Sequence, residues 1–305
     1  MQAQLRDMAY FAAIAEHGQV QRAAAALGLS QPALSKGLRR LEQAMNARLV
    51  KRTPKGIELT SAGSALLAQI RRLRLSLDDI TREISDLSLG RAGHLRVGIA
   101  PSFASDLVPN ACAALLQEAP RVTFKVTVLE REASLSALRR GELDLALTAL
   151  PVPRDDGLVE EHLIEDKYVV YASANHRLAG KKRVTLADLA RERWAVLAFN
   201  TPTPERIGQV FADAGLPRPE IAMESNSPAL RHRLLASSNL VGFAPQRVVR
   251  EATPRAHFAE LHVKDLTYTR RAGVIYRKDA YLSPAAKRFI EILKRIASEI
   301  AKENR

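Results

Sequence analysis

The sequence predicts an α/β protein in which a small helical unit and one long helix precede a larger region of alternating strands and helices. Three observations support this fold class. Short amphipathic helices fill residues 1–60, a helical pattern without Pro or Gly runs over 64–89, and strands alternate with helices after residue 93. A chain of 305 residues is long for one hydrophobic core and suggests two or three domains.

Composition and charge narrow the class of protein. The net charge of +13 and the isoelectric point near 10.2 favour acidic partners such as nucleic acid or an anionic membrane surface. The single cysteine, Cys112, lies in an Ala- and Leu-rich stretch and is expected to pack as a small apolar residue. We find no signal peptide and no segment long enough to span a bilayer, and therefore expect a cytoplasmic protein that contacts no membrane.

The first two helices are short and rich in alanine. The first is expected to end at Gly18 and the second to cover Val20–Leu27, where small side chains allow a neighbouring helix to approach closely. The apolar face expected for the first helix consists of Leu5, Met8, Ala9, Phe11, Ala12 and Ala15. Gly28 then permits a tight turn into the next helix.

A third helix follows this turn and carries two different faces. Ser30 can cap it, and Pro32 falls in its first turn, where a missing N–H costs nothing. Its inward positions are Leu34, Leu38 and Leu41, and its outward positions are Gln31, Ser35, Lys36 and Arg39. Two helices around a short Gly-containing turn, the second with such a polar face, are typical of a helix-turn-helix. Gln can read an adenine edge, and Arg or Lys can read guanine or bind phosphate.

Two short strands, expected over 49–52 and 57–60, form a hairpin wing with a basic tip at Lys55. From Arg22 to Lys55 there are eight basic residues against one acid, Glu42. Such a basic run also occurs on an ordinary solvated surface. The charge alone therefore leaves open whether this region binds nucleic acid or only faces water.

The helix that follows carries a heptad seam with alternating spacings of four and three residues. The seam consists of Leu66, Ile70, Leu73, Leu77, Ile80, Ile84 and Leu87. A lone helix would leave this stripe in water, so we expect it to pair with the same helix of a second copy. A paired helix with a basic unit on each copy would place two reading heads on one duplex.

From residue 93 onward the pattern changes to buried strands and crossover helices. Strands are expected at 95–99, 122–129, 143–147, 167–172, 194–198, 221–224, 241–244 and 272–276, and helices at 106–118, 133–140, 204–214, 228–237 and 283–303. This order indicates a mostly parallel sheet.

The N-terminal region resembles the LysR-type transcriptional regulators of bacteria. The matching pieces are Arg22–Ala24, Leu29–Lys36, Leu38–Glu42, Leu49, Arg52–Thr53, Gly56 and Leu59–Gly63, in order and at the family's spacing. The chain departs from the family at Gln19, Gln21, Asn46 and Val50, so the second helix lacks its usual cap.

The resemblance implies a winged helix-turn-helix at 1–60, a linker and dimerisation helix at 61–90, and a two-lobed, periplasmic-binding-protein-like (type 2) effector domain at 91–305. The lobes would comprise about 93–163 with 268–305, and 164–267, joined at hinges near 163–166 and 263–268. The implied DNA-binding residues are Gln31, Pro32, Ser35, Lys36, Arg39, Arg52 and Lys55. The implied partners are promoter or operator DNA, a small-molecule effector, further copies of the chain in a homodimer or homotetramer, and RNA polymerase.

The effector is expected outside the carboxyl ends of the strands, between the lobes. The candidate contacts are Ser102, Phe103, Thr148, Thr201, Asn226 and Phe243. Ser102 precedes a helix, whose free N–H groups suit an anion, although a plain helix cap explains it as well. For Thr148, Thr201 and Asn226 structural and binding roles are equally open, and Phe103 and Phe243 fit a core role better. The net positive charge of the chain and the helix that follows Ser102 together favour a small organic anion as effector. We expect no other cofactor.

Other functions remain as alternatives. Seven scattered histidines give no metal-ligand spacing, and no phosphate loop or nucleophile elbow is present, so we predict no catalytic or metal site. A solute-binding protein or an enzyme could use the same two-lobed fold, but residues 1–90 would then have no role. In a non-specific architectural DNA-binding protein, the α/β region would have no role.

Overall fold

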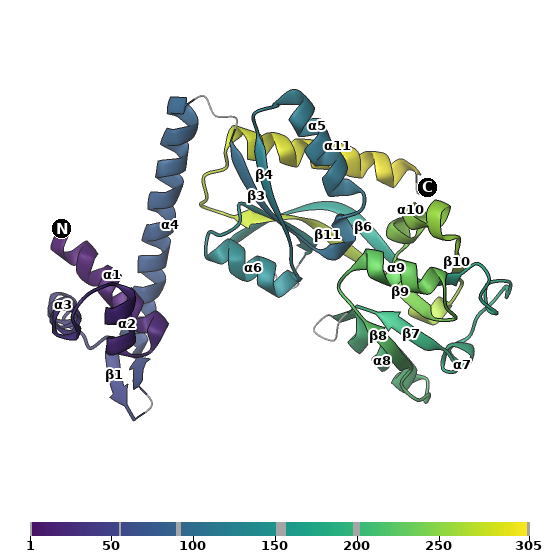
Figure 1. The fold of residues 1–305 in the computed structure, drawn as a ribbon, viewed down its shortest axis with the longest axis horizontal. Coiled ribbons are helices and arrows are strands. Elements are labelled where there is room, and N and C mark those ends of the chain that lie inside the picture. Colours follow the sequence, from purple (N-terminus) through teal and green to yellow (C-terminus); the bar gives the residue numbers. More distant parts are fainter. Residues whose placement is uncertain (1, 55, 90–92, 151–156, 198–201, 304–305) are drawn as a thin grey trace. The chain divides into compact units, whose positions relative to one another are not determined.

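A computed structural model describes residues 2–54, 56–89, 93–150, 157–197 and 202–303 (Figure 1). The chain divides into two compact units, residues 1–82 and 83–305. Among the described residues, no helix is both long enough and apolar enough to cross a lipid bilayer.

The N-terminal unit contains the predicted helix-turn-helix and wing. Its elements are α1 (Gln2–His17), α2 (Val20–Ala26), α3 (Gln31–Ala44), β1 (Val50–Thr53), β2 (Gly56–Leu59) and the first part of α4 (Ser61–Leu89). Its core is made by Phe11 and Ile14 of α1, Leu34 and Leu41 of α3, and Leu49 before β1. The two strands pair in antiparallel fashion as the hairpin requires.

Local signals place the ends of these helices. Ser30 accepts a hydrogen bond from the backbone N–H of Ala33 at 3.4 Å, and Thr60 caps α4 by accepting one from Gly63 at 3.0 Å. Asn46 adopts a left-handed conformation with φ of 48° after α3. Gln19 precedes α2 without a side-chain cap, as the sequence predicted.

The predicted apolar face of α1 is partly wrong. Phe11 and Ala12 are buried, but Leu5 and Ala9 are exposed, and Ile14 joins the core instead. The reason is that α2 and α3 pack against α1, so the burial follows these contacts rather than the whole apolar stripe.

The C-terminal unit has a mixed sheet with helices on its faces (Figure 1). Its strands are β3 (His94–Ile99), β4 (Thr123–Val128), β5 (Leu145–Ala149), β6 (Leu158–Ser173), β7 (Arg193–Val196), β8 (Glu220–Glu224), β9 (Val241–Pro245), β10 (Phe258–Leu261) and β11 (Tyr268–Arg277). Its helices are η1 (Pro101–Phe103), α5 (Leu107–Glu118), α6 (Arg131–Arg139), α7 (Leu186–Leu189), α8 (Pro202–Asp213), α9 (Pro228–Ala236), α10 (Gln246–Ala256), η2 (Lys264–Leu266) and α11 (Pro284–Glu303).

The strand order is β4-β3-β5-β11-β6-β9-β7-β8, with β10 added beside β6. The trios β4-β3-β5 and β8-β7-β9 are parallel, as crossover helices dictate. The prediction of a mostly parallel sheet is corrected at the centre, where β6 and β11 run antiparallel to each other and to β9 and β5. These two long strands connect one parallel trio to the other.

Two lobes result, each with its own core. The first contains Leu95, Phe103 and Leu115 and is covered by Phe289 of α11. The second contains Trp194, Phe211 and Phe243. Strand β6 passes through both lobes: Leu158–Tyr168 pairs with β11, and Tyr168–Ala172 pairs with β9. The first predicted hinge, 163–166, therefore lies inside a continuous strand.

Among the described elements of this unit, five were not predicted from the sequence: α7, α10, β10 and the short helices η1 and η2. The four-residue α7 is too short for a periodic pattern, although Thr185 and Asp188 form a capping box. The helix α10 contains Pro254, which argues against a helix when read alone. Strand β10 is placed by pairing with β6, a contact between residues far apart in the chain.

Candidate DNA-binding surface and effector cleft

The outer face of α3 is presented to solvent in the N-terminal unit. Gln31, Pro32, Lys36 and Arg39 are exposed, and Ser35 is half-buried at the edge of this face. Leu34, Leu38 and Leu41 bury the opposite face. The helix therefore offers amide, hydroxyl and cationic groups together on one side, as direct readout of a major groove requires.

The inner face of α3 is seated on α1 by a close contact and an ion pair. A Cβ at Gly37 would lie 2.6 Å from Cδ2 of Tyr10, so only glycine permits this approach. Arg40 donates to both carboxylate oxygens of Asp7, at 2.9 Å from Nε and 2.6 Å from Nη2. Hydrogen bonding to Asp7 raises the pKa of Arg40. The sequence did not predict this pair. It holds Arg40 against α1, whereas the neighbouring Arg39 is exposed.

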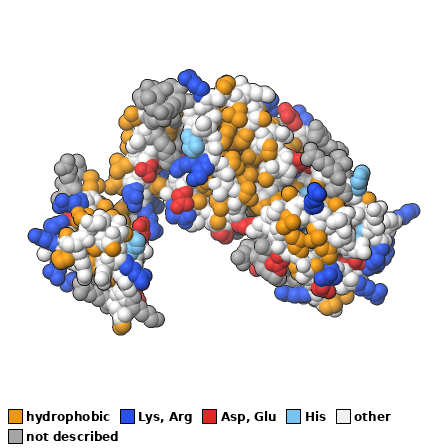
Figure 2. Space-filling view, viewed as in Figure 1, with side chains coloured by type: hydrophobic (Ala, Val, Ile, Leu, Met, Phe, Trp, Pro, Cys, Tyr) orange, Lys and Arg blue, Asp and Glu red, His pale blue; other side chains and the backbone are white. Residues whose placement is uncertain are grey.

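The one acid of the basic run faces inward. Glu42 is buried and accepts a hydrogen bond from the backbone N–H of Leu49 at 2.9 Å, tying α3 to the start of the wing. It therefore does not present a negative charge on the polar face of α3. Lys and Arg side chains lie around the outside of this unit in Figure 2, at the lower left.

The wing is described only in part. Lys51 is exposed on β1, and the backbone of Arg52 pairs with Ile57. Lys55 and the side chain of Arg52 lie outside the described part of the chain, so their predicted contacts with DNA remain predictions.

The heptad seam of α4 divides into two parts. Leu66 and Ile70 pack in the core of the N-terminal unit. Further along, Leu73, Leu77, Ile80 and Ile84 are exposed by 41, 51, 50 and 59%. The side chain of Leu87 lies outside the described residues. A row of four large apolar side chains in water is the surface that a second helix would cover.

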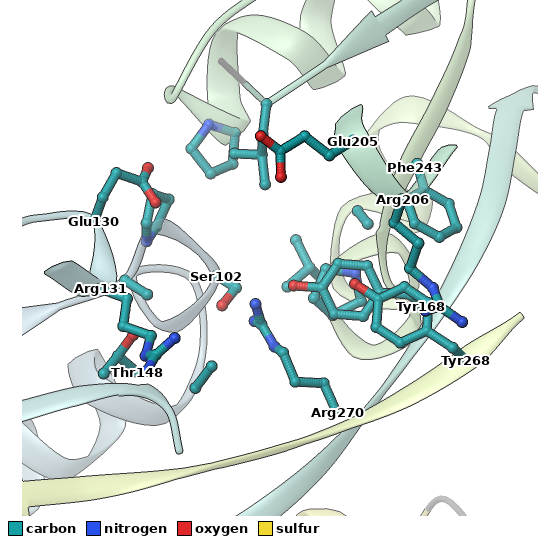
Figure 3. Close-up of a pocket in the computed structure, with 18 of the residues that line it drawn as sticks. Ser102, Glu130, Arg131, Thr148, Tyr168, Glu205, Arg206, Phe243, Tyr268 and Arg270 are labelled. Atoms are coloured by element: carbon teal, nitrogen blue, oxygen red, sulfur yellow. The ribbon is translucent and has the colours of Figure 1, made fainter. Parts of the chain in front are cut away.

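A cavity of about 710 Å³ lies in the C-terminal unit where the two lobes meet (Figure 3). The first lobe contributes Ser102 from η1, Glu130 after β4 and Thr148 from β5. The second contributes Phe243 from β9, Arg206 from α8 and Arg231 from α9. The long strands β6 and β11 add Tyr168, Tyr268 and Arg270. This volume suits a small molecule.

Three of the six predicted effector contacts line this cavity: Ser102, Thr148 and Phe243. Phe103 is fully buried in the core of the first lobe, with the guanidinium of Arg247 4.9 Å from its ring centroid. Asn226 is exposed outside the described lining, and Thr201 lies outside the described residues.

Ser102 is not the cap of the following helix. That role belongs to Asp106, whose Oδ1 accepts from the N–H of Leu107 at 2.6 Å. The hydroxyl of Ser102 is buried at the cavity with no hydrogen-bond partner among the described residues. A buried hydroxyl without a partner is costly, and a ligand in the cavity could satisfy it.

Four side chains that the sequence did not predict form a stack along one wall (Figure 3). Arg206 lies 4.1 Å from the ring centroid of Tyr268, which stacks on Tyr168 at 4.8 Å, and Arg270 lies 4.9 Å from the ring of Tyr168. A guanidinium group that lies over an aromatic ring can keep N–H groups for other partners. The prediction considered only residues that follow the carboxyl ends of strands. Tyr168 and Arg270 lie within β6 and β11, so it missed them.

The charges in the cavity are mixed. The described lining includes four cations, Arg131, Arg206, Arg231 and Arg270, and three carboxylates, Glu130, Glu132 and Glu205. Desolvation raises the pKa of Glu130, although Arg270 and Arg231 act in the opposite direction. Buried atoms without partners include Nε of Arg131 and of Arg270 as donors and Oε1 of Glu130 as an acceptor. The site thus suits a ligand with acceptor oxygens more than an apolar one.

No cluster suited to metal binding occurs in the described segments, where no three His, Cys, Asp or Glu side chains converge. Cys112 is half-buried, and desolvation raises the pKa of its thiol to about 11, which disfavours a nucleophilic thiolate.

Comparisons with known proteins match both regions of the chain to one family. Residues 5–64 match a family described as "Bacterial regulatory helix-turn-helix protein, lysR family", and residues 88–298 match "LysR substrate binding domain". The SDS degradation transcriptional activation protein of Pseudomonas sp. (strain ATCC 19151) is 30% identical over 93% of both chains. The regulator CbbR of Xanthobacter flavus is 29% identical over 95% of this chain and 87% of its own.

Solved structures share the fold. CbnR in complex with its target DNA has a TM-score of 0.52 and 24% identity, covering 96% of this chain and 99% of that one. HinK, a LysR family transcriptional regulator from Pseudomonas aeruginosa, has a TM-score of 0.56 and 22% identity, covering 97% of this chain and 99% of that one. The relatives are transcriptional regulators rather than enzymes, and with an N-terminal helix-turn-helix and a C-terminal effector-binding domain this chain belongs to the LysR family of transcriptional regulators.

Proposed function

We propose that two copies of the chain pair along α4, so that each presents an α3 helix to one DNA duplex as a sequence-specific regulator. The observation that carries this proposal is the exposed row Leu73, Leu77, Ile80 and Ile84 on the helix that follows the DNA-binding unit. Pairing would bury this row and fix the separation of the two α3 helices at about 34 Å or a multiple of it. We extend the proposal to a homotetramer and to contact with RNA polymerase on family resemblance alone.

On the DNA, we assign different roles to the exposed groups of α3 and the wing. Gln31 and Ser35 read base edges, and Pro32 sets the entry of the helix. The cations Lys36, Arg39, Arg52 and Lys55 bind phosphates. Phosphate contacts supply salt-dependent affinity, whereas base contacts supply specificity. Because its target is chromosomal DNA, we place the protein in the cytoplasm.

In the effector domain, we propose that a small organic anion binds in the cavity between the lobes. Ser102, Thr148 and Phe243 line this cavity, and Arg270 faces it with a cation. Phe103 supports the site from the core, and Thr201 remains a predicted contact. Asn226, outside the described lining, is not part of this proposal. We retain the lobe limits of about 93–163 with 268–305, and 164–267.

Competition binding tests the function. The full chain is titrated into labelled DNA from upstream of its own gene, with unlabelled copies of that fragment or random DNA of equal length as competitor. A specific regulator is displaced by the random fragment only at concentrations at least about 1,000-fold higher. Equal competition by the two fragments contradicts the proposal and favours an architectural protein.

A ligand screen tests the effector class. The thermal unfolding midpoint of the full chain is measured with matched six-carbon probes: hexanoate, adipate, 1-hexanol and hexylamine. The proposal expects the carboxylates to raise the midpoint more than the alcohol or the amine. A response to the amine alone would contradict an anionic effector.

A further inference from the structure

An ion cluster joins the two lobes beside the cavity. It consists of Asp106, Asp166 and Arg247, and we call it the cross-lobe cluster. Arg247, on α10 of the second lobe, donates from Nη1 to both carboxylate oxygens of Asp106, at 2.6 and 2.8 Å. Asp106 caps α5, whose residues Leu107 and Val108 belong to the core of the first lobe. The contact therefore crosses from one lobe to the other.

The third member of the cluster is on the strand that connects the lobes. Arg247 also donates from Nε to Oδ1 of Asp166, on β6, at 2.7 Å. The side chains of Arg247, Asp106 and Asp166 are only 8, 15 and 0% exposed. Desolvation opposes the charge of Arg247, but Asp166 and Asp106 outweigh it, so the pKa of Arg247 lies above its ordinary value. Buried ions of this kind are strongly destabilised when one partner is removed.

The cross-lobe cluster adjoins the effector cavity. Pro245 and Val248, on either side of Arg247 in the chain, line the cavity. Arg270 also lines it, and its Nη2 lies 3.7 Å from Oδ2 of Asp166. Asp166 is therefore shared by two cations: Arg247, which it holds closely, and Arg270, which lines the cavity and lies at a longer distance.

We propose that Arg247 is a positioning residue that holds the two lobes together at the cavity, and that Asp166 links it to the cation that faces the ligand. The Arg270 charge repels Arg247 and competes with it for Asp166. An anion that pairs with Arg270 neutralises this competitor, and Arg247 then holds both carboxylates, and with them both lobes, more firmly. This second step rests on the proposed function, because it assigns the effector's anionic group to Arg270.

The distance between the lobes tests the proposal without any ligand or DNA. Spin labels are attached at Gln117→Cys on α5 and Ala212→Cys on α8, both exposed positions, in a Cys112→Ala background. Labelled chains are diluted with unlabelled chains, so that double electron–electron resonance measures only distances within one chain. Circular dichroism confirms that each variant folds.

Asp106→Asn and Asp106→Ser remove the charge that crosses between the lobes. Asn and Ser both cap helices, so α5 is expected to survive, and Ser is too short to reach Arg247. We expect both variants to shift the inter-lobe distance to a longer mean and to broaden its distribution. The control Asp144→Asn removes a similarly shielded carboxylate that pairs with Arg96 inside the first lobe, and should leave the distance unchanged.

Arg270→Gln tests the link, because it removes the competing charge as a bound anion would. We expect a narrower distribution than in the wild type. An Asp106→Ser distribution that matches the wild type overturns the positioning role, and broadening in Arg270→Gln overturns the link through Asp166. The distance measurement uses neither DNA nor effector, so neither of its results decides the proposed function. Conversely, a failed DNA competition or ligand screen would not overturn the role of the cross-lobe cluster.

Discussion

Cationic side chains are placed differently in the two units of the molecule. On α3, Lys36 and Arg39 are exposed to solvent on one face. Next to the cavity between the lobes, Arg247 is buried between two carboxylates and lies over the ring of Phe103. Exposed charges act over distance and are weakened by salt, whereas buried charges act through fixed geometry and are screened little. The exposed cations of α3 suit binding to a long polyanion. The buried Arg247 suits holding the two lobes in a fixed arrangement.

The largest expected effect follows from breaking the pairing of the α4 helices, which would bring the exposed cations of two copies onto one duplex. Ile80→Asp places a charge in the middle of the exposed seam, where pairing would bury it on both helices. We expect the dimer dissociation constant to rise at least 100-fold, equivalent to about 2.8 kcal/mol, with a parallel loss of operator affinity. Sedimentation equilibrium measures the first and fluorescence anisotropy the second. Ala68→Asp adds the same charge at an exposed position off the seam; equal losses in both variants would contradict pairing along the seam.

The next effect separates base readout from charge. Gln31→Ala should reduce discrimination between the operator and its single-base variants by about 1–3 kcal/mol at the position that Gln31 reads, because a bidentate contact to a base edge is lost. Binding to a panel of substituted operators measures this. Gln43→Ala, an exposed glutamine at the other end of α3, is the matched control. A loss that is uniform over the panel would assign Gln31 to the backbone instead.

A smaller effect tests whether exposed cations of the two units differ in function. Arg39→Gln should lower the slope of log affinity against log salt by about 0.9, the value for one phosphate contact. Arg193→Gln removes another exposed cation, this one from the C-terminal unit, where it pairs with Glu220 at 2.6 Å, and should leave the slope unchanged. If both variants change the slope alike, net charge rather than position governs DNA binding.

The smallest effect concerns Glu130, a half-buried carboxylate in the lining of the cavity. Desolvation raises the pKa of Glu130, so the folded state favours its protonated form. The stability from this group is complete below the ordinary pKa of glutamate and is lost as pH rises through the raised value. Glu130→Gln should therefore flatten the decline of unfolding free energy with pH in this window. Glu132→Gln, on an exposed neighbour in the same lining, should keep the decline, and a decline unchanged in Glu130→Gln would contradict the assignment.

The two units also differ in what the sequence could predict. Ser30, Gly18 and the spacing of Leu34, Leu38 and Leu41 are local signals, and the helices of the N-terminal unit begin and end within a few residues of the prediction. The antiparallel placement of β6 and β11 was not predicted, because it depends on pairing between strands about a hundred residues apart. Periodicity identifies a strand but not its neighbours.

The same limit applies to the sites. The outer face of α3 could be predicted because one helix carries it. In the cavity, Ser102, Thr148 and Phe243 follow from the rule of strand ends, and they line it. Tyr168 and Arg270 were missed because they lie within strands that pass between the lobes. The Arg247–Asp106 contact joins residues 141 positions apart and has no local signal.

The most direct test of the account is native mass spectrometry of the full chain with a single fragment of its own upstream DNA. Pairing along α4 predicts complexes that contain two or four copies of the chain, and only two-copy or larger species should persist when random DNA is added in excess. A complex that contains one copy, or one that random DNA removes as readily as the specific fragment does, would contradict the account.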